Sequence, residues 1–451
     1  MNSDMSNLDD LTPFLHGPVT LTCPRMVLLC RDHEPYLVEG AGTFSIINDT
    51  DFEYRLIGVP ADLSHAMRVL QREREARYEP LTQFRLLLWD RDGREWNAGW
   101  TVPNVQISED EWVFTGECIT LTGASSGEPT GEGAAEARFI IPRNHGASAA
   151  LRRIVRTEVE PGRWEPHHTI DVLGSPVTFR FDETLNVLAI SVPSSATMQA
   201  HAAESWLGEP LRILFGQLVF PRLVERRFAE GHSMFWVRQS PCWKRDTAWL
   251  ALWNAHDRNT EAEFFDLYRD LLVMVVREGG WESHTVTAYF EEVIQAMRGS
   301  RWVWALTMAG SIEGIARILV PEATVRADAD PEAVSALIRH IDAWPGSTRL
   351  KDTAKGAVGR ADQVSVLRGL LDLASDDVGT RGQVNIWKKV RNDVMHGGLV
   401  SNYTTEEDDS ILLGLADLLR ALTREAARRA AADELAPPSE DAGRGYDSQR
   451  A

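Results

Sequence analysis

The hydrophobic period of this chain changes near residue 250, and that change constrains the fold more than any other feature. In residues 42–47 and 52–58, apolar and polar side chains alternate with a period of two, which is typical of β-strands with one buried face. From about residue 260 the apolar residues recur every three or four positions, beginning with Phe264 and Tyr268, which is typical of amphipathic helices. Two architectures of different class therefore follow one another along the chain.

This change of period predicts an α+β multidomain fold, with a β-rich N-terminal domain followed by an all-α helical bundle. A chain of 451 residues is long enough for two or three domains. We expect the β-rich domain at residues 1–250, the helical bundle at 258–435 and a disordered tail at 436–451, where two prolines precede a polar stretch.

Local signals refine the β-rich half. An Asp-Gly pair after the strand that begins at Phe84 predicts a hairpin turn, and a second hairpin is expected over residues 177–192. Residues 112–116 and 118–122 predict another pair of strands. Helical spacing appears at 62–77 and 196–218, and the small residues of 124–137 predict a loop.

The helical half has clear start and stop signals. Ser300 precedes a helix, Pro331 occupies a first helical position, and Thr404 opens a capping-box sequence for a final helix that ends near Leu435. A helix over residues 383–396 stops at two glycines. Together these signals predict a bundle of four to six helices.

Charge and cysteine content exclude several classes of protein. The formal net charge of −19 argues against a protein that coats nucleic acid, although residues 281–430 are near neutral, with 18 Lys and Arg against 21 Asp and Glu. The four cysteines form no CxxC pair, so we expect no metal site, no disulfide framework and no cofactor. The polar N-terminus and the lack of an 18-residue apolar run predict a cytoplasmic protein without a membrane segment.

The strongest functional pattern is an arginine followed five positions later by a histidine. The chain contains it three times, at Arg163–His168, Arg227–His232 and Arg391–His396. A proline interrupts the first copy and a glycine precedes the histidine of the second, so neither is expected to be helical. The third copy lies in a helical pattern and has Asn392 directly after the arginine.

On a helix, these third-copy residues would share one surface. Lys388, Asn392 and His396 follow one another at four-residue intervals, opposite an apolar stripe, and Arg391 lies between the two. Arginine binds phosphate oxygens, histidine transfers protons near neutral pH, and an asparagine amide can orient either group. The same residues would also serve as an ordinary helix end, where histidine and glycine are common.

Arg391-Asn392 and His396, placed at the end of the penultimate major helix and before a long final helix, resemble the HEPN domain. The stretch Ser311-Ile-Glu-Gly-Ile, which contains Glu313, is similar to an earlier HEPN helix. A β-rich domain before the HEPN domain resembles the ApeA-like branch of this family, and residues 38–58 also resemble that branch.

The resemblance implies a metal-independent endoribonuclease with Arg391, Asn392 and His396 as catalytic residues and Lys388 and Lys389 as candidate RNA contacts. It further implies a homodimer or higher homo-oligomer formed through HEPN domains, products with a 2′,3′-cyclic phosphate, and a role in bacterial anti-phage defence. There, cleavage of cellular RNA such as tRNA would cause abortive infection after a phage-derived trigger.

Two alternatives stay open. The bundle could be a non-catalytic dimerisation module that binds a ligand or partner, with the motif as a phosphate-binding or capping feature. The β-rich domain could carry a site that senses a carbohydrate or a protein, although no set of residues in its sequence indicates a particular ligand.

Overall fold

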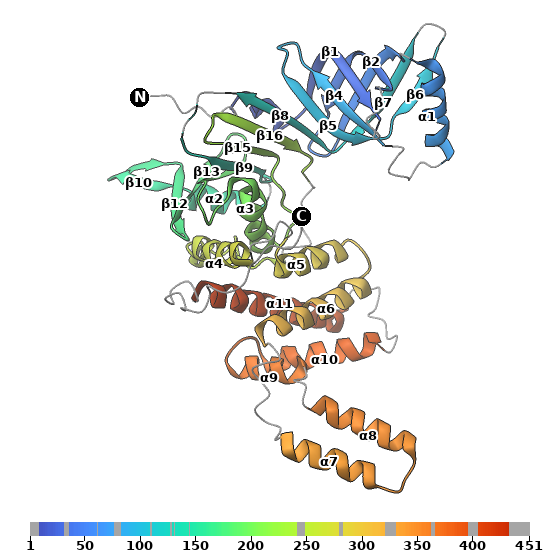
Figure 1. Ribbon diagram of the computed structural model, residues 1–451. Helices are drawn as coiled ribbons and strands as arrows, with labels where there is room; N and C mark the ends of the chain where they lie inside the picture. The colour runs from blue at the N-terminus through green and yellow to red at the C-terminus, as the bar shows by residue number, and fades with distance from the viewer. Residues whose placement is uncertain are drawn as a thin grey trace. The chain divides into compact units, whose positions relative to one another are not determined.

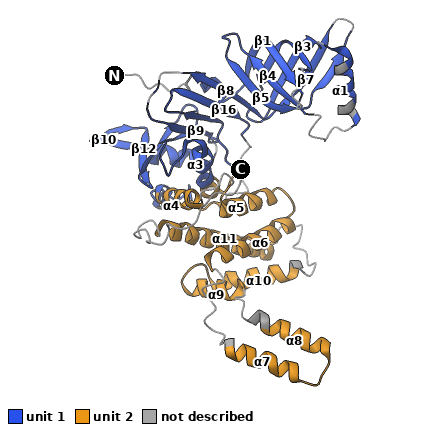
Figure 2. Ribbon diagram, viewed as in Figure 1, with its two compact units in different colours: residues 1–211, 218–245, 254–265 blue, residues 212–217, 246–253, 266–451 orange. Residues whose placement is uncertain are grey.

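The computed structural model of the chain describes residues 9–30, 36–60, 62–75, 83–108, 111–126, 129, 131–143, 145–240, 249–278, 283–320, 331–361, 366–395 and 405–432. The chain forms two compact units (Figure 2). Unit 1 comprises residues 1–211, 218–245 and 254–265, and unit 2 comprises residues 212–217, 246–253 and 266–451.

Unit 1 is built on a 14-stranded sheet in which all neighbouring strands are antiparallel. A separate hairpin of β10 (Thr157–Glu160) and β11 (Arg163–Glu165) lies outside the sheet. In spatial order, the strands of the sheet are β12 (His167–Val172), β13 (Ser175–Asp182), β14 (Val187–Pro193), β9 (Ala134–Ile140), β15 (Leu223–Arg227), β16 (His232–Arg238), β8 (Thr120–Ser126), β5 (Glu95–Thr101), β4 (Phe84–Trp89), β1 (Val19–Leu29), β2 (Val38–Ile46), β3 (Phe52–Val59), β7 (Trp112–Cys118) and β6 (Asn104–Ile107).

The half of the sheet from β8 to β6 encloses an aromatic core. Phe44, Phe52, Trp96 and Phe114 are almost completely buried in it. Each lies on the inward side of a strand whose burial alternates, as the period-two pattern predicts. The Thr101 hydroxyl, at the end of β5, donates a hydrogen bond of 2.9 Å to a carbonyl on β7, which shows that this half of the sheet curls.

Arg222 is a fully buried arginine beside this core. Its guanidinium donates hydrogen bonds only to backbone carbonyls, at 3.0 Å to Phe14, 3.0 Å to Asp49 and 2.7 Å to Arg238. Burial lowers the pKa of Arg222 to about 10. The side chain thus joins three segments that are far apart in the sequence.

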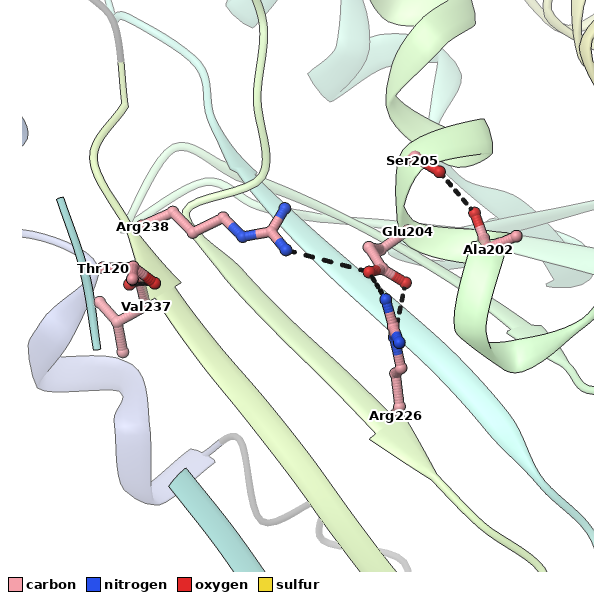
Figure 3. A network of polar contacts seen from close by, with 7 residues as sticks. All are labelled: Thr120, Ala202, Glu204, Ser205, Arg226, Val237 and Arg238. Atoms are coloured by element: carbon pink, nitrogen blue, oxygen red, sulfur yellow. Dashed lines mark hydrogen bonds and ion pairs between the residues drawn. The ribbon is translucent and has the colours of Figure 1, made fainter. Parts of the chain in front are cut away.

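Helices α1 (Leu63–Glu75), α2 (Gly146–Ile154) and α3 (Ala200–Phe215) complete the regular structure of the β-rich half. Figure 3 shows how α3 is tied to the sheet: the buried Glu204 carboxylate accepts from Arg226 on β15, with one bond of 2.9 Å, and faces Arg238 on β16 at 3.9 Å. Arg226 also lies 4.6 Å over the ring of Trp236. Because a buried carboxylate is costly without a cationic partner, the pair of Glu204 with Arg226 fixes α3 on that face of the sheet.

The longest segment of unit 2, residues 266–451, has α-helices as its only regular structure among the described residues (Figure 1). Helix α6 packs against α5, α9, α10 and α11, and α7 packs against α8 to form a hairpin. Among the residues that the structure describes, no helix is long and apolar enough to span a membrane. The helices are α4 (Glu263–Glu278), α5 (Thr285–Ala296), α6 (Arg301–Leu319), α7 (Pro331–Ala343), α8 (Thr348–Ala361), α9 (Val366–Ser375), α10 (Arg381–Met395) and α11 (Glu406–Ala432).

The predicted fold class is confirmed, since a β-rich region precedes an all-α region. Several helix starts are also confirmed. Ser300 caps α6 by accepting from the amide of Val303, and α7 begins at Pro331. The predicted start of α11 is also found, although the hydroxyl that accepts from the amide of Asp408 belongs to Thr405, one position after the predicted Thr404. The predicted tail at 436–451 and the glycine stop after residue 396 lie outside the described residues.

Three details of the prediction are wrong. The described part of the helical region contains eight α-helices, not four to six. Helix α5 was not predicted, and residues 350–374, whose pattern predicts one mainly helical stretch, are divided into α8 and α9. Strands β7 and β8 are not partners: β7 pairs with β3 and β6, and β8 pairs with β5 and β16. The predicted loop at 124–137 is partly strand, since β8 continues to Ser126 and β9 starts at Ala134.

Candidate functional site

Helix α10, which carries the third arginine–histidine motif, has one buried and one exposed face. Val384, Trp387 and Val390 are buried at three-residue intervals. The partly buried Ile386 meets α11 at Gly414, where a Cβ would lie only 2.7 Å from the isoleucine side chain. The absence of a side chain at that glycine therefore lets α10 and α11 approach closely.

Two contacts, one helical turn apart, align α10 with α6. The indole N–H of Trp387 donates a 3.0 Å hydrogen bond to the carbonyl of Ala309. One turn later, Nε of Arg391 donates a 2.9 Å hydrogen bond to Oε2 of Glu313. Since both pairs advance by four residues on both helices, α6 and α10 run in the same direction here and hold Arg391 in register.

Glu313 sits between two arginines. Its other carboxylate oxygen accepts a 2.9 Å hydrogen bond from Arg317, one turn further along α6. Partial burial alone would raise the pKa of Glu313, but the hydrogen bonds and charges of Arg317 and Arg391 outweigh it and hold this pKa below its usual range. The carboxylate is therefore ionised at neutral pH, and the three side chains together carry one net positive charge.

Arg391 is fixed at its Nε but accessible at its end. Its side chain is 43% exposed, against 22% for Glu313, and its guanidinium lies 5.8 Å from the ring of Trp387. Within the described residues, Nε is the only guanidinium nitrogen of Arg391 with a hydrogen-bond partner. A guanidinium held in this way can present its two terminal nitrogens to an anion.

The other predicted site residues lie on the exposed side of the same helix. Asn392, Lys388 and Lys389 are exposed. His396 falls just beyond the last described residue of α10, so its position lies outside the described residues. The structure thus brings Arg391 and Asn392 to one surface and adds Glu313, whose contact with Arg391 the sequence did not predict.

The other two arginine–histidine copies are not helical, as expected, and lie in β-structure. Arg163 and His168 belong to β11 and β12, and the His168 ring stacks on Phe265 with centroids 3.9 Å apart. Arg227 and His232 flank the connection between β15 and β16. Neither copy places its two side chains on one helical face.

In the described part of the chain, no group of three or more His, Cys, Asp and Glu residues has a geometry that could hold a metal ion. Comparison with models of protein families, with characterised proteins and with solved structures gives no match.

Proposed function

We propose that this chain is a metal-independent endoribonuclease of HEPN type. The observation that carries the proposal is the presentation of Arg391, oriented by Glu313, beside Asn392 on the exposed face of α10. An oriented, accessible guanidinium next to an amide suits a phosphodiester, because it can bind two phosphate oxygens in a fixed geometry.

The chemistry would be an internal transesterification of RNA. The 2′-hydroxyl loses its proton to a general base and its oxygen bonds to the adjacent phosphorus, while the bond from phosphorus to the 5′-oxygen breaks and that oxygen takes up a proton. His396 would transfer one of these protons, Arg391 would stabilise charge on the phosphate, and Asn392 would orient a neighbouring group. The products are a 2′,3′-cyclic phosphate and a 5′-hydroxyl.

A second copy of the chain is part of the proposal, since one helix supplies one proton-transfer group and the reaction uses two. The resemblance to HEPN domains supports a homodimer in which two motifs face each other. It also supports a role in anti-phage defence, in which cleavage of cellular RNA such as tRNA, switched on by a phage-derived trigger, stops the growth of an infected cell.

The decisive experiment compares wild type with His396→Ala on total cellular RNA, with the ends of every new fragment mapped and chemically typed. The matched control is His340→Ala, which removes an exposed histidine from α7 in the same unit. We expect cleavage by wild type and the control, with cyclic phosphate ends, and none by His396→Ala. Full cleavage by His396→Ala would contradict the proposal.

The ion pair with Glu313 also favours a second candidate function, a non-catalytic module that binds a partner or ligand. In that case the pair between Arg391 and Glu313 would serve to dock α10 on α6 and would have no role in chemistry. This candidate predicts that purified wild type cuts no RNA, while a partner or a nucleotide binds with measurable affinity.

A further inference from the structure

A polar groove lies in unit 1, on the outer face of strands β2, β3, β7 and β6. Its volume is about 430 Å³, within the range of sites for small molecules. The strands alternate, so that Phe44, Tyr54 and Phe114 point into the core while their neighbours line the groove. The side chains that matter here are Thr43, Glu53, Arg55, Asn104, Thr115 and Glu117.

The strand register places these side chains in two adjacent rows. Thr43, Arg55, Thr115 and Asn104 are consecutive partners across β2, β3, β7 and β6. In the next row, Glu53 is the direct partner of Glu117. One row therefore carries a positive charge with hydroxyl and amide groups, and the other carries two negative charges.

None of the six side chains has a hydrogen-bond or ion-pair partner among the described residues. Other carboxylates of unit 1, such as Glu39 and Glu136, are paired with arginines. The two glutamates are also opposite each other, and directly opposed like charges on neighbouring strands are destabilising. Their carboxylates are therefore available to a ligand and would be stabilised by a cation.

We propose that this groove binds a small, zwitterionic, peptide-like ligand. Its cationic group would lie between Glu53 and Glu117, which can accept several charge-assisted hydrogen bonds at once. Its carboxylate would bind Arg55, and Asn104 and Thr115 would pair with its amide groups. This binding function is independent of the proposed ribonuclease activity.

The composition of the groove selects this class of ligand. Ile47 is the only large aliphatic side chain in the lining, and the one aromatic residue there, Tyr54, has its ring buried in the core. A sugar or a nucleobase usually stacks on an exposed aromatic ring, which this lining does not offer. A lone anion would meet one arginine and two carboxylates, so it would be repelled overall.

The test is isothermal titration calorimetry, in which the full chain is titrated separately with each of three probes. Glycyl-arginine carries a carboxylate and two cationic groups, argininamide keeps two cationic groups but no carboxylate, and acetylglycine keeps a carboxylate but no cation. We expect saturable binding of glycyl-arginine, weaker binding of argininamide and no binding of acetylglycine. The variants are Glu53→Gln and Glu117→Gln, and the control is Glu95→Gln, an exposed glutamate at the start of β5 outside the groove.

Each groove variant should weaken glycyl-arginine binding by roughly tenfold or more, because a charge-assisted contact is lost, whereas the control should bind like wild type. Each groove variant should also unfold at a higher temperature than wild type without ligand, since it removes a repulsion; a purely structural carboxylate would give the opposite shift. Failure of all three probes to bind wild type would overturn the proposal, as would equal affinity of wild type and both groove variants.

Discussion

Replacing Glu313 by alanine tests whether this carboxylate positions Arg391 for RNA cleavage or only contributes to the stability of the fold. The carboxylate accepts a 2.9 Å hydrogen bond from Nε of Arg391, whose side chain is 43% exposed. Water screens a pair of this kind, so its loss should reduce the free energy of unfolding by about 1 kcal/mol or less. For a domain of this size, that lowers the unfolding temperature by roughly 2–4 °C.

The effect on RNA cleavage should be larger. Without Glu313, the Arg391 side chain regains rotational freedom worth up to about 2 kcal/mol, which must be lost again whenever it binds the phosphate. Since 1.4 kcal/mol corresponds to a factor of about ten, we expect kcat/KM to fall by up to roughly 30-fold. The assays are single-turnover cleavage of a defined RNA and thermal unfolding followed by circular dichroism.

Arg317→Ala is the matched control, because Arg317 bonds the same carboxylate from within α6 itself, whereas Arg391 reaches it from α10. It should leave cleavage within about twofold of wild type. Glu313→Gln keeps an acceptor for Nε, so it should recover part of the lost rate. Wild-type cleavage by Glu313→Ala would refute the positioning role, and so would a loss of rate that only parallels a loss of folded protein.

Three further perturbations test the fold. Arg222→Met should destabilise unit 1 by about 3–5 kcal/mol in urea unfolding, since it orphans buried carbonyls. Burial, aided by the charge of Glu136, raises the pKa of Glu225. The folded state therefore favours the protonated acid and loses stability as the pH rises through that pKa. Glu225→Gln should unfold at a higher temperature than wild type at pH 8, and this difference should shrink by pH 4. Trp387→Phe removes the hydrogen bond to Ala309 and should cost about 1–2 kcal/mol, measured by thermal unfolding.

The fold class was predictable because hydrophobic period is a local property of the sequence. Helix starts were predictable where a conventional cap is present, as at Ser300 and Thr405. Helix α5 was missed because its cap is His284, whose ring nitrogen accepts from the amide of Val286 in place of a Ser, Thr, Asp or Asn oxygen. A histidine cap has no distinctive sequence signal.

Long-range partners could not be predicted from local pattern. Strands β7 and β8 are consecutive, and consecutive strands usually pair, but here β7 pairs with β6 before it and with the distant β3, and β8 pairs with β5 and β16. Arg391 and Glu313 are 78 residues apart, and only the packing of α10 on α6 brings them together. The spacing of Glu313 and Arg317 by four residues was the one local signal that this carboxylate is paired.

The same geometry bears on the choice between an enzyme and a binding module. Glu313, Arg317 and Arg391 leave one net positive charge beside the exposed lysines of α10, so both functions predict phosphate affinity that weakens with salt. The salt dependence of binding therefore cannot distinguish an enzyme from a binding module. A test of whether the 2′-hydroxyl of RNA is the attacking group can. An RNA with one 2′-deoxy nucleotide at the mapped cleavage position keeps every phosphate, so it should bind like the parent RNA and yet not be cut at that bond. Cleavage of that bond would exclude attack by the 2′-hydroxyl, because the deoxy nucleotide has no such group.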